Sequence, residues 1–472
     1  MSTSPEVAQS TLGQATAALR LAIGEDRVLT ASAVLDDYSH DTWPLSTVAS
    51  QLGRHEHRPD VVVQVATEND VLAVLEIARE HSVALTARGL GSSVTGQPLP
   101  TRGGIVLDLA GLVGEPVLSE TDLTVTVPAG VRGSDLEEWL QERGLTHNFT
   151  PQSMARSSVG GWLATRATGQ LSSKYGGIEV SAVGARVALA DGSIITLGQR
   201  PRAAVGPDLL QMFLGSEGMF GVILEVTLRV YRQAPTTISE AFTVPTVDAG
   251  LAVLREAYQA GLRPSLMRLY DASEARHAVP GTDPGPVLFL SHDGLPDVAR
   301  AEHAASSAIV AAHSGASLGA GPVDAWYARR YDFSTVEKLL AQEGGYAETV
   351  EVAHLWSGLP ELYTELTTAL APLADEVLGH FSHVYTNGAS LYVILLGQAP
   401  SNEEALRRLE QIWQVAMETT TRVGGELSHH HGAGLARQEY IPANLGSQHE
   451  VLRRIQHALD PTAVLNPGHL GL

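Results

Sequence analysis

The sequence predicts an α+β protein in which two domains are followed by a short segment that packs back onto them. The chain has 472 residues, more than one ordinary core uses, so two or three domains are expected. Residues 58–233 alternate β-branched runs with helical patterns, and residues 234–450 alternate Ala-rich helices with short strands. Residues 1–57 look helical and then irregular, whereas residues 451–472 end in turn formers and are too short to fold alone. We therefore expect the last segment to pack against a core formed by the preceding domains.

The first domain is predicted from strands and helices that follow one another closely. A β-branched run at 61–66 precedes an amphipathic helix at 68–81, and a second strand at 83–89 leads into a Gly/Ser loop. An Asp-Gly pair lies inside a predicted hairpin at 183–198. The other elements expected in this domain are strands at 104–109, 123–130 and 221–231, and helices at 133–144 and 208–216.

The second domain is predicted from a change in composition after residue 234. Its helices are rich in Ala, and they separate short apolar strands in an α+β pattern that implies a second core. The strands are expected at 237–244, 264–271, 285–292 and 390–397.

Composition restricts the classes of function. The chain has 31 Lys and Arg against 52 Asp and Glu, and a net charge of −21 repels nucleic acid and anionic membranes. It has no Cys, so disulfides, Fe–S clusters and thiolate nucleophiles are excluded. No apolar run is long enough for a transmembrane segment and the N-terminus lacks a secretory pattern, so we expect a cytoplasmic protein. The expected partners are a small-molecule substrate and, as an assembly to test, a second copy in a homodimer.

Three Gly-rich stretches carry the functional signal. Residues 88–96, Arg-Gly-Leu-Gly-Ser-Ser-Val-Thr-Gly, follow a strand, and their glycines and hydroxyls let consecutive N–H groups contact a pyrophosphate. Alone, this stretch fits a plain Gly-rich turn equally well, and it matches neither Rossmann nor P-loop spacing. Residues 151–169, followed by Lys-Tyr-Gly-Gly at 174–177, surround Trp162 with small and hydroxyl residues, which suits a flat ring and a diphosphate or an ordinary helix start. Residues 215–223 form a tight turn that enters an apolar strand.

In this order and spacing the three stretches resemble the PCMH-type FAD-binding half of the vanillyl-alcohol-oxidase superfamily. The resemblance implies that the first loop wraps the pyrophosphate, that the second lines the isoalloxazine and ribityl chain, and that the third meets the adenosine side. Residues 465–468 resemble the family's C-terminal return to the flavin. The first loop lacks the His that commonly carries covalent FAD in this superfamily, so non-covalent FAD is implied. The implied cofactor contacts are Arg88, Gly89, Leu90, Gly91, Ser92, Ser93, Gln97, Pro151, Ser153, Met154, Ser157, Ser158, Gly160, Gly161, Trp162, Thr165, Arg166, Glu217, Gly221, Val222, Ile223 and Asn466.

Within the superfamily the sequence is most similar to the alkyldihydroxyacetonephosphate synthase branch. The similar stretches are 160–169, 174–179, 379–385, 390–392 and the three consecutive histidines at 429–431. By this resemblance Tyr392 and the histidines would lie over the reactive face of the flavin as acid/base groups and substrate contacts. The candidate catalytic residues are Tyr392, His430, His431 and Arg268.

The three histidines can also be interpreted without the family. On a strand, consecutive side chains point to alternate faces, so His429, His430 and His431 cannot all bind one metal ion. Imidazoles that titrate near neutral pH suit proton transfer, and an exposed or packed cluster is the alternative. Tyr392 alone is better explained as a core aromatic on a strand.

Two departures from the family patterns bear on function. The metal-dependent 2-hydroxyacid dehydrogenases of this superfamily have a His where this chain has Tyr392 and a Glu where it has His430, so no metal site of that type is expected. The ether synthases carry a substrate Arg in an Arg-Asp pair that aligns with residues 336–337, which are Val-Glu here. Arg329 and Arg330 are the nearby candidates to replace it, although a phosphate clamp depends on guanidinium geometry.

The sequence leads to one main hypothesis and two alternatives. The main hypothesis is an FAD-dependent oxidoreductase that oxidises a small alcohol or hydroxy acid by hydride transfer to flavin N5, with Tyr392 or His431 taking the hydroxyl proton. The first alternative is a redox-neutral, ether-forming transferase like alkyldihydroxyacetonephosphate synthase, which uses a flavin adduct. The second alternative is a flavin-fold protein that only binds a cofactor or a partner.

Overall fold

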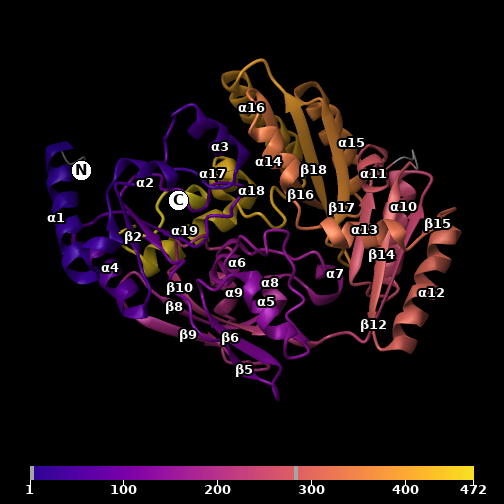
Figure 1. Ribbon diagram of the computed structural model, residues 1–472, viewed down its shortest axis with the longest axis horizontal. Coiled ribbons are helices and arrows are strands. Elements are labelled where there is room, and N and C mark those ends of the chain that lie inside the picture. Colours follow the sequence, from indigo (N-terminus) through magenta and orange to yellow (C-terminus); the bar gives the residue numbers. More distant parts are fainter. Residues whose placement is uncertain (1–4, 281–284) are drawn as a thin grey trace.

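The computed structural model describes residues 5–280 and 285–472, and it has an α+β fold built around three main sheets (Figure 1). The first sheet has the order β1 (Val28–Leu29), β2 (Val61–Gln64), β4 (Ile105–Asp108) and β3 (Leu85–Arg88). Strands β2, β4 and β3 run parallel, and β1 is antiparallel to β2. Both β2 and β3 begin within two residues of the predicted positions, because their β-branched and apolar side chains are buried against helices.

The second sheet is antiparallel and lies beside the first. Its order is β5 (Val117–Ser119), β6 (Thr124–Pro128), β10 (Val222–Arg229), β8 (Ala182–Ala188) and β9 (Ile194–Gly198), and the predicted hairpin at 183–198 is confirmed as β8–β9. One hydrophobic core joins both sheets. A further pair joins β7 (Leu145–Thr146) to β11 (Tyr231–Arg232).

Helices cover these two sheets and connect them. Helix α4 (Glu68–Glu80) begins at a capping box, in which Thr67 accepts from the Asp70 backbone N–H and Asp70 accepts from the Thr67 backbone N–H. The other helices up to β11 are α1 (Pro5–Ile23), α2 (Ser32–Asp37), α3 (Pro44–Gln51), α5 (Gly133–Gln141), α6 (Val159–Thr165), α7 (Ser172–Tyr175), α8 (Ile178–Ser181) and α9 (Leu210–Phe213).

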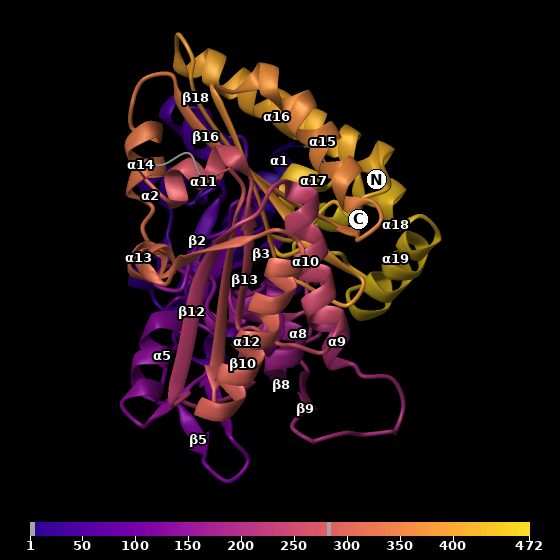
Figure 2. The same ribbon diagram turned by 90° about the vertical axis from the view of Figure 1, so that its right-hand side faces the viewer.

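The third sheet is formed by the second half of the chain and is antiparallel throughout. Its order is β15 (Ala316–Gly319), β12 (Thr236–Thr243), β14 (Val287–Gly294), β13 (Leu266–Tyr270), β17 (Glu376–Ser382), β18 (Gly388–Gln398) and β16 (Gly345–Leu355). The long helices α10 (Val247–Gln259), α12 (Pro296–Ala312), α15 (Leu359–Leu370) and α16 (Asn402–Arg422) pack on its outer face (Figures 1 and 2). Shorter helices lie at its ends and on its inner side: α11 (Ala272–Ala278), α13 (Gly321–Arg329) and α14 (Ser334–Leu340).

The C-terminal segment returns to the first sheet. After α17 (Gly434–Arg437), α18 (Ile441–Leu445) and α19 (Ser447–Leu459), the chain forms a parallel bridge between Leu85 and Leu465. The Leu85 backbone N–H donates to Val464 at 2.7 Å, and the Asn466 N–H donates to Leu85 at 2.7 Å. Asn466 therefore lies beside the Gly-rich loop that follows β3. Among the described helices, none is both long and apolar enough to cross a membrane.

Candidate active site

A cavity of about 1000 Å³ lies between the Gly-rich loops and the inner face of the third sheet. Residues from both halves of the chain line it, so the sequence segments that carry the functional signal meet in one place. The predicted cofactor contacts that line it are Gly89, Leu90, Gly91, Ser92, Ser93, Gln97, Pro151, Ser153, Ser157, Ser158, Gly160, Gly161, Trp162, Thr165, Glu217, Gly221 and Ile223. All four candidate catalytic residues, Arg268, Tyr392, His430 and His431, line the same cavity.

The loop after β3 presents free backbone donors to this cavity. In the described chain, the N–H groups of residues 90–94 donate no hydrogen bond to protein atoms. Gly91 has a φ of +67°, which a residue with a Cβ adopts with strain. A run of unpaired N–H groups beside a cavity suits an anion such as a diphosphate.

The second Gly-rich stretch packs closely against the first. A Cβ on Gly89 would lie 2.4 Å from Ser158 Oγ, and a Cβ on Gly160 would lie 2.6 Å from the Ala129 Cβ. The Trp162 ring is packed against Phe149 and donates through Nε1 to Ser157 Oγ at 2.8 Å. The glycines are therefore required by the close approach of two backbone segments at the cavity wall.

Five predicted cofactor contacts do not line the cavity in the described chain. Met154 and Val222 belong to the hydrophobic core, and Arg166 ends α6 with a φ of +54°. Arg88 donates to the His40 carbonyl at 3.0 Å, and Asn466 donates to the Glu217 carbonyl at 2.5 Å. These side chains hold the loops in place, and Asn466 Oδ1 and Arg88 Nη1 are buried without a hydrogen-bond partner in the described chain.

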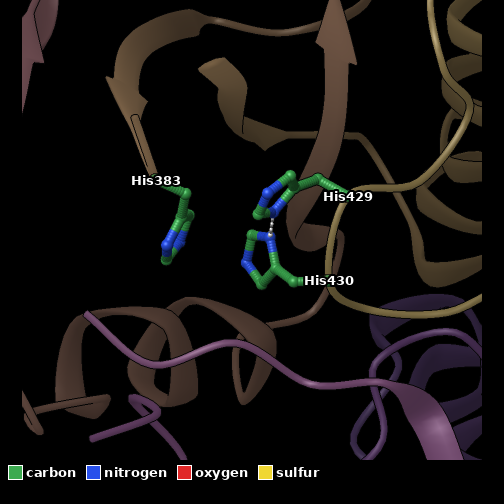
Figure 3. Close-up of side chains that lie close together, drawn as sticks. All are labelled: His383, His429 and His430. Carbon is green, nitrogen blue, oxygen red and sulfur yellow. Dashed lines mark hydrogen bonds between the residues drawn. The ribbon is translucent and has the colours of Figure 1, made fainter. Parts of the chain in front are cut away.

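The histidines form a cluster with His383, which the sequence analysis does not single out as a site residue (Figure 3). His429 Nδ1 lies 3.0 Å from His430 Nδ1, and the His383 ring is stacked on His429 with centroids 4.9 Å apart. Burial lowers the pKa of His429 and of His430 to about 3 and that of His431 to about 4. The cluster is therefore uncharged at neutral pH.

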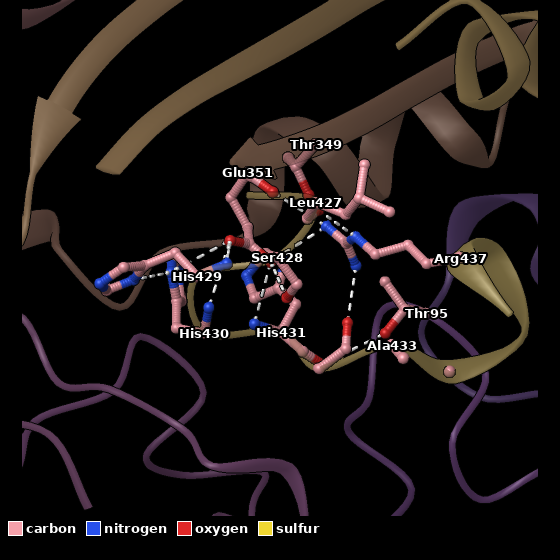
Figure 4. A network of polar contacts seen from close by, with 12 residues as sticks. Thr95, Thr349, Glu351, Leu427, Ser428, His429, His430, His431, Ala433 and Arg437 are labelled. Carbon is pink, nitrogen blue, oxygen red and sulfur yellow. Dashed lines mark hydrogen bonds and ion pairs between the residues drawn. The ribbon is translucent and has the colours of Figure 1, made fainter. Parts of the chain in front are cut away.

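The segment that carries the three histidines is a loop, so the expectation of a strand is wrong (Figure 4). The backbone N–H groups of His429, His430 and His431 donate to the Glu351 carboxylate at 2.5, 3.2 and 3.0 Å. They therefore pair with a side chain instead of a neighbouring strand. Because the segment curves around this carboxylate, adjacent histidines are not restricted to opposite faces.

A buried ion pair fixes this loop. Glu351 on β16 and Arg437 on α17 are both inaccessible to solvent, and their nearest charged atoms are 3.0 Å apart. Arg437 also donates to the carbonyls of Leu427, Gly432 and Glu351 at 2.7, 2.9 and 3.0 Å. Burial alone would raise the pKa of Glu351, but Arg437 and the histidines hold it well below its ordinary value. The carboxylate is therefore ionised, and it lies 3.8 Å from His431 Nδ1.

Tyr392 lies among imidazoles on the cavity side of β18. Its ring is stacked on His380 with centroids 4.8 Å apart and meets the His431 ring edge-on at 5.6 Å. Burial raises the pKa of Tyr392 well above its ordinary value, so the phenol carries its proton at neutral pH. The core interpretation of this residue is wrong, since its side chain lines the cavity.

Arg268 belongs to a chain of polar contacts on the same wall. It donates to His380 Nε2 at 2.9 Å, and His380 Nδ1 donates to Glu274 at 2.8 Å. Neither His380 nor Glu274 is a predicted site residue. His380 lies beside Tyr392 because the register of β17 and β18 pairs these two residues. No local sequence pattern indicates that pairing.

The cavity also has a cationic end. Arg329 and Arg330 line it, and Arg330 Nε is buried without a hydrogen-bond partner in the described chain. Arg329 is engaged with the carbonyls of His277 and Ala278 at 3.2 and 3.0 Å. The Arg330 guanidinium lies over the rings of Tyr327 and Tyr331, 4.9 and 4.8 Å from their centroids.

The shifted histidines make stability depend on pH. The unfolded chain binds protons near pH 6.5, whereas the folded histidines bind them near pH 3 to 4, so stability is lost as pH falls from 6.5 towards 4. Glu348, whose pKa burial raises to about 8, opposes this trend, whereas His292, whose pKa burial lowers to about 4, adds to it. We expect the melting temperature to fall between pH 6.5 and pH 4. The fall should be smaller in His429→Gln and unchanged in the surface variant His313→Gln; a higher melting temperature at pH 4 would contradict the assignment.

The residues of the cavity fit an extended dinucleotide such as FAD. Unpaired N–H groups and close-packed glycines in its wall suit a diphosphate, and the same cavity is lined by an acid/base cluster. The fold and the lining of this cavity thus point to the class of FAD-binding flavoproteins.

The comparisons with known proteins agree with this class. A model of the FAD binding domain matches residues 59–198, and a model of the C-terminal domain of FAD linked oxidases matches residues 235–470. The chain belongs to the FAD-linked oxidases and is an FAD-dependent oxidoreductase of that family.

Three relatives show the range of named activities. The chain is 29% identical to the uncharacterized FAD-linked oxidoreductase YgcU of Escherichia coli strain K12, over 95% of this chain and 96% of the relative. It is 26% identical to alkyldihydroxyacetonephosphate synthase of Trypanosoma brucei brucei, over 89% and 74%. It is 26% identical to the mitochondrial D-lactate dehydrogenase (cytochrome) of Arabidopsis thaliana, over 87% and 73%. A solved alkyldihydroxyacetonephosphate synthase shares the fold, with a TM-score of 0.80 at 22% identity over 99% of this chain and 86% of that one.

Proposed function

We propose that the protein oxidises the alcohol carbon of a small anionic substrate, a 2-hydroxy acid, with FAD as a non-covalent cofactor. The observation that carries the proposal is one cavity lined by the Gly-rich loops, by Tyr392, His430 and His431, and by Arg330, whose Nε has no hydrogen-bond partner in the described chain. A D-lactate dehydrogenase among the relatives supports this substrate class.

The side chains supply the steps that the protein itself performs. Bound FAD would supply the hydride acceptor, which takes the hydrogen of the substrate carbon together with the electron pair of the carbon–hydrogen bond. The substrate hydroxyl loses its proton to His431, which lines the cavity, directly or through Tyr392, whose ring meets the His431 ring edge-on. The ionised Glu351, 3.8 Å away, stabilises the imidazolium that forms. The alcohol becomes a carbonyl, and Arg330 holds the carboxylate through charge-assisted hydrogen bonds.

The proposal is tested by anaerobic addition of a panel of D- and L-2-hydroxy acids, each with its neutral methyl ester, to the purified yellow protein. We expect the flavin colour to bleach with at least one acid and much less with its ester. Equal bleaching by acid and ester would show that the cationic end does not recognise the carboxylate of the substrate. Bleaching by neutral alcohols alone would show that the substrate is not a 2-hydroxy acid.

Substitution of Arg330 tests the recognition of the carboxylate. Arg330→Gln removes a charge-assisted contact, so KM for the acid should rise about 10- to 100-fold with a smaller change in kcat. The matched control is Arg300→Gln on the exposed face of α12, where the guanidinium pairs with Asp297. An unchanged KM in Arg330→Gln would show that another group binds the carboxylate.

The mode of FAD attachment is a separate prediction. The loop at 88–97 contains no His, so denaturation in trichloroacetic acid should release the flavin into the supernatant. Yellow colour that stays in the protein pellet would show a covalent bond, and the cavity-lining histidines would then be the first candidates for it.

A second function is favoured by the synthase among the relatives and by the same cationic end, which could hold a phosphate. This is the redox-neutral formation of an ether from a fatty alcohol and an acylated ketone phosphate. A product assay with those two substrates decides it: an ether product supports this function, and its absence excludes it.

A further inference from the structure

One nitrogen atom from each of His383, His429 and His430 lies within 4.8 Å of the others (Figure 3). His383 follows β17, and the other two come from the loop around Glu351. The three side chains converge from two separate segments, with the His383 ring stacked on the His429 ring. A convergence of three imidazoles is a common feature of transition-metal sites in proteins.

The other ring nitrogens are held by hydroxyl groups. Ser172 Oγ lies 2.7 Å from His383 Nδ1, and the Tyr385 hydroxyl lies 2.8 Å from His429 Nε2. This leaves His383 Nε2 and His429 Nδ1 to face the centre of the cluster. Histidines that bind metals use one nitrogen for the ion and the other for such a hydrogen bond, which fixes the ring.

An acidic side chain lies next to the cluster. The ionised Glu351 lies 3.6 Å from His430 Nδ1 and places negative charge next to the cluster.

We propose that His383, His429 and His430 bind one divalent transition-metal ion, with Zn²⁺ or Co²⁺ as the matching class. Metal–nitrogen bonds of about 2.0–2.1 Å place two ligand nitrogens of a tetrahedral site about 3.4 Å apart. On binding, the 3.0 Å distance between His429 Nδ1 and His430 Nδ1 therefore increases slightly, and the His383 ring rotates toward the ion. His383 and His430 line the cavity, so the fourth position is open to water or to an oxygen of an anionic substrate.

This ligand set differs from the metal site of the 2-hydroxyacid dehydrogenases, which the sequence does not predict for this chain. The 2-hydroxyacid dehydrogenase site requires groups at Tyr392 and His430, and a phenol with a raised pKa is a poor ligand. The proposed set replaces Tyr392 with His383 and His429. The inference rests on the geometry of the imidazoles and does not depend on the reaction proposed above.

The test is ion binding by the FAD-loaded protein after treatment with a chelator. Isothermal titration with Zn²⁺ alone, and elemental analysis after dialysis, should give one ion per chain. His383→Ala and His429→Ala should abolish this binding, and Ser172→Ala should weaken it about 10- to 100-fold. His313→Ala, on the surface beside Glu256, should bind as the wild type does. Each variant is compared at equal FAD content, so that a folding defect is recognised.

A second measurement needs no variant. X-ray absorption at the Zn edge should show three imidazole nitrogens and one oxygen. The proposal is overturned if the wild-type protein binds no ion, if the His383→Ala and His429→Ala variants bind it equally well, or if the bound ion has fewer than two imidazole ligands.

Discussion

Tyr392→Phe is expected to lower kcat by about 10²- to 10⁴-fold while FAD remains bound. The substitution removes only the hydroxyl, and the ring can keep its stacking on His380. The loss therefore reports on proton transfer and not on packing. The measurement is the anaerobic rate of flavin reduction by the substrate found in the panel, with FAD content and KM determined in parallel.

The control is Tyr363→Phe on α15. Its hydroxyl is also hydrogen-bonded, to Asp271 at 3.0 Å, but it lies outside the cavity, so catalysis should be unchanged. His431→Ala should show a loss comparable to that of Tyr392→Phe. If Tyr392→Phe and His431→Ala both reduce flavin at the wild-type rate, the assigned proton path is wrong.

Glu351→Gln is expected to lower the free energy of unfolding by about 3–5 kcal/mol. The change leaves Arg437 as an uncompensated buried charge, and removing one partner of a buried pair has this order of cost. It also weakens the acceptor for three backbone N–H groups, so the histidine loop should lose its order. Urea denaturation followed by far-ultraviolet circular dichroism measures the stability, and proteolysis between residues 427 and 434 measures the order of the loop.

A double variant separates the effect of the unpaired Arg437 charge on stability from the effect of the lost carboxylate on the histidine loop. Glu351→Gln with Arg437→Met removes the unpaired cation and should recover part of the stability without restoring activity. The control is the exposed Glu450→Gln, whose carboxylate pairs with Arg453 and Arg454 on the surface of α19 and should leave stability unchanged. A Glu351→Gln protein as stable as the wild type would show that the pair is not needed for folding.

Much of the cofactor half of the site could be predicted from sequence because its signals are local. Glycines after β3 and in the first turn of α6 occupy positions where a Cβ would clash, so residue type and position carry the information. Tyr392 and the histidines could be placed in the same site only through the family resemblance, because nothing in one strand or loop indicates which side chains will face one another.

The network behind the histidines could not be predicted, for a physical reason. Glu351 is one alternating position of a strand, and Arg437 is one residue of a short helix. Their structural role depends on a 3.0 Å contact between the two side chains, which are 86 residues apart in the sequence. The strand expected for the three histidines is wrong for the same reason: their N–H groups are satisfied by this distant carboxylate. His380 and Glu274 likewise depend on sheet register.

The most direct test of the account is the anaerobic reduction of the enzyme by a 2-hydroxy acid carrying deuterium at the alcohol carbon. We expect the flavin absorbance to bleach, the deuterated acid to react more slowly than the ordinary acid, and a 2-keto acid to accumulate. If no 2-hydroxy acid reduces the flavin while the fatty alcohol and acylated ketone phosphate yield an ether, the central claim is contradicted and the redox-neutral function replaces it.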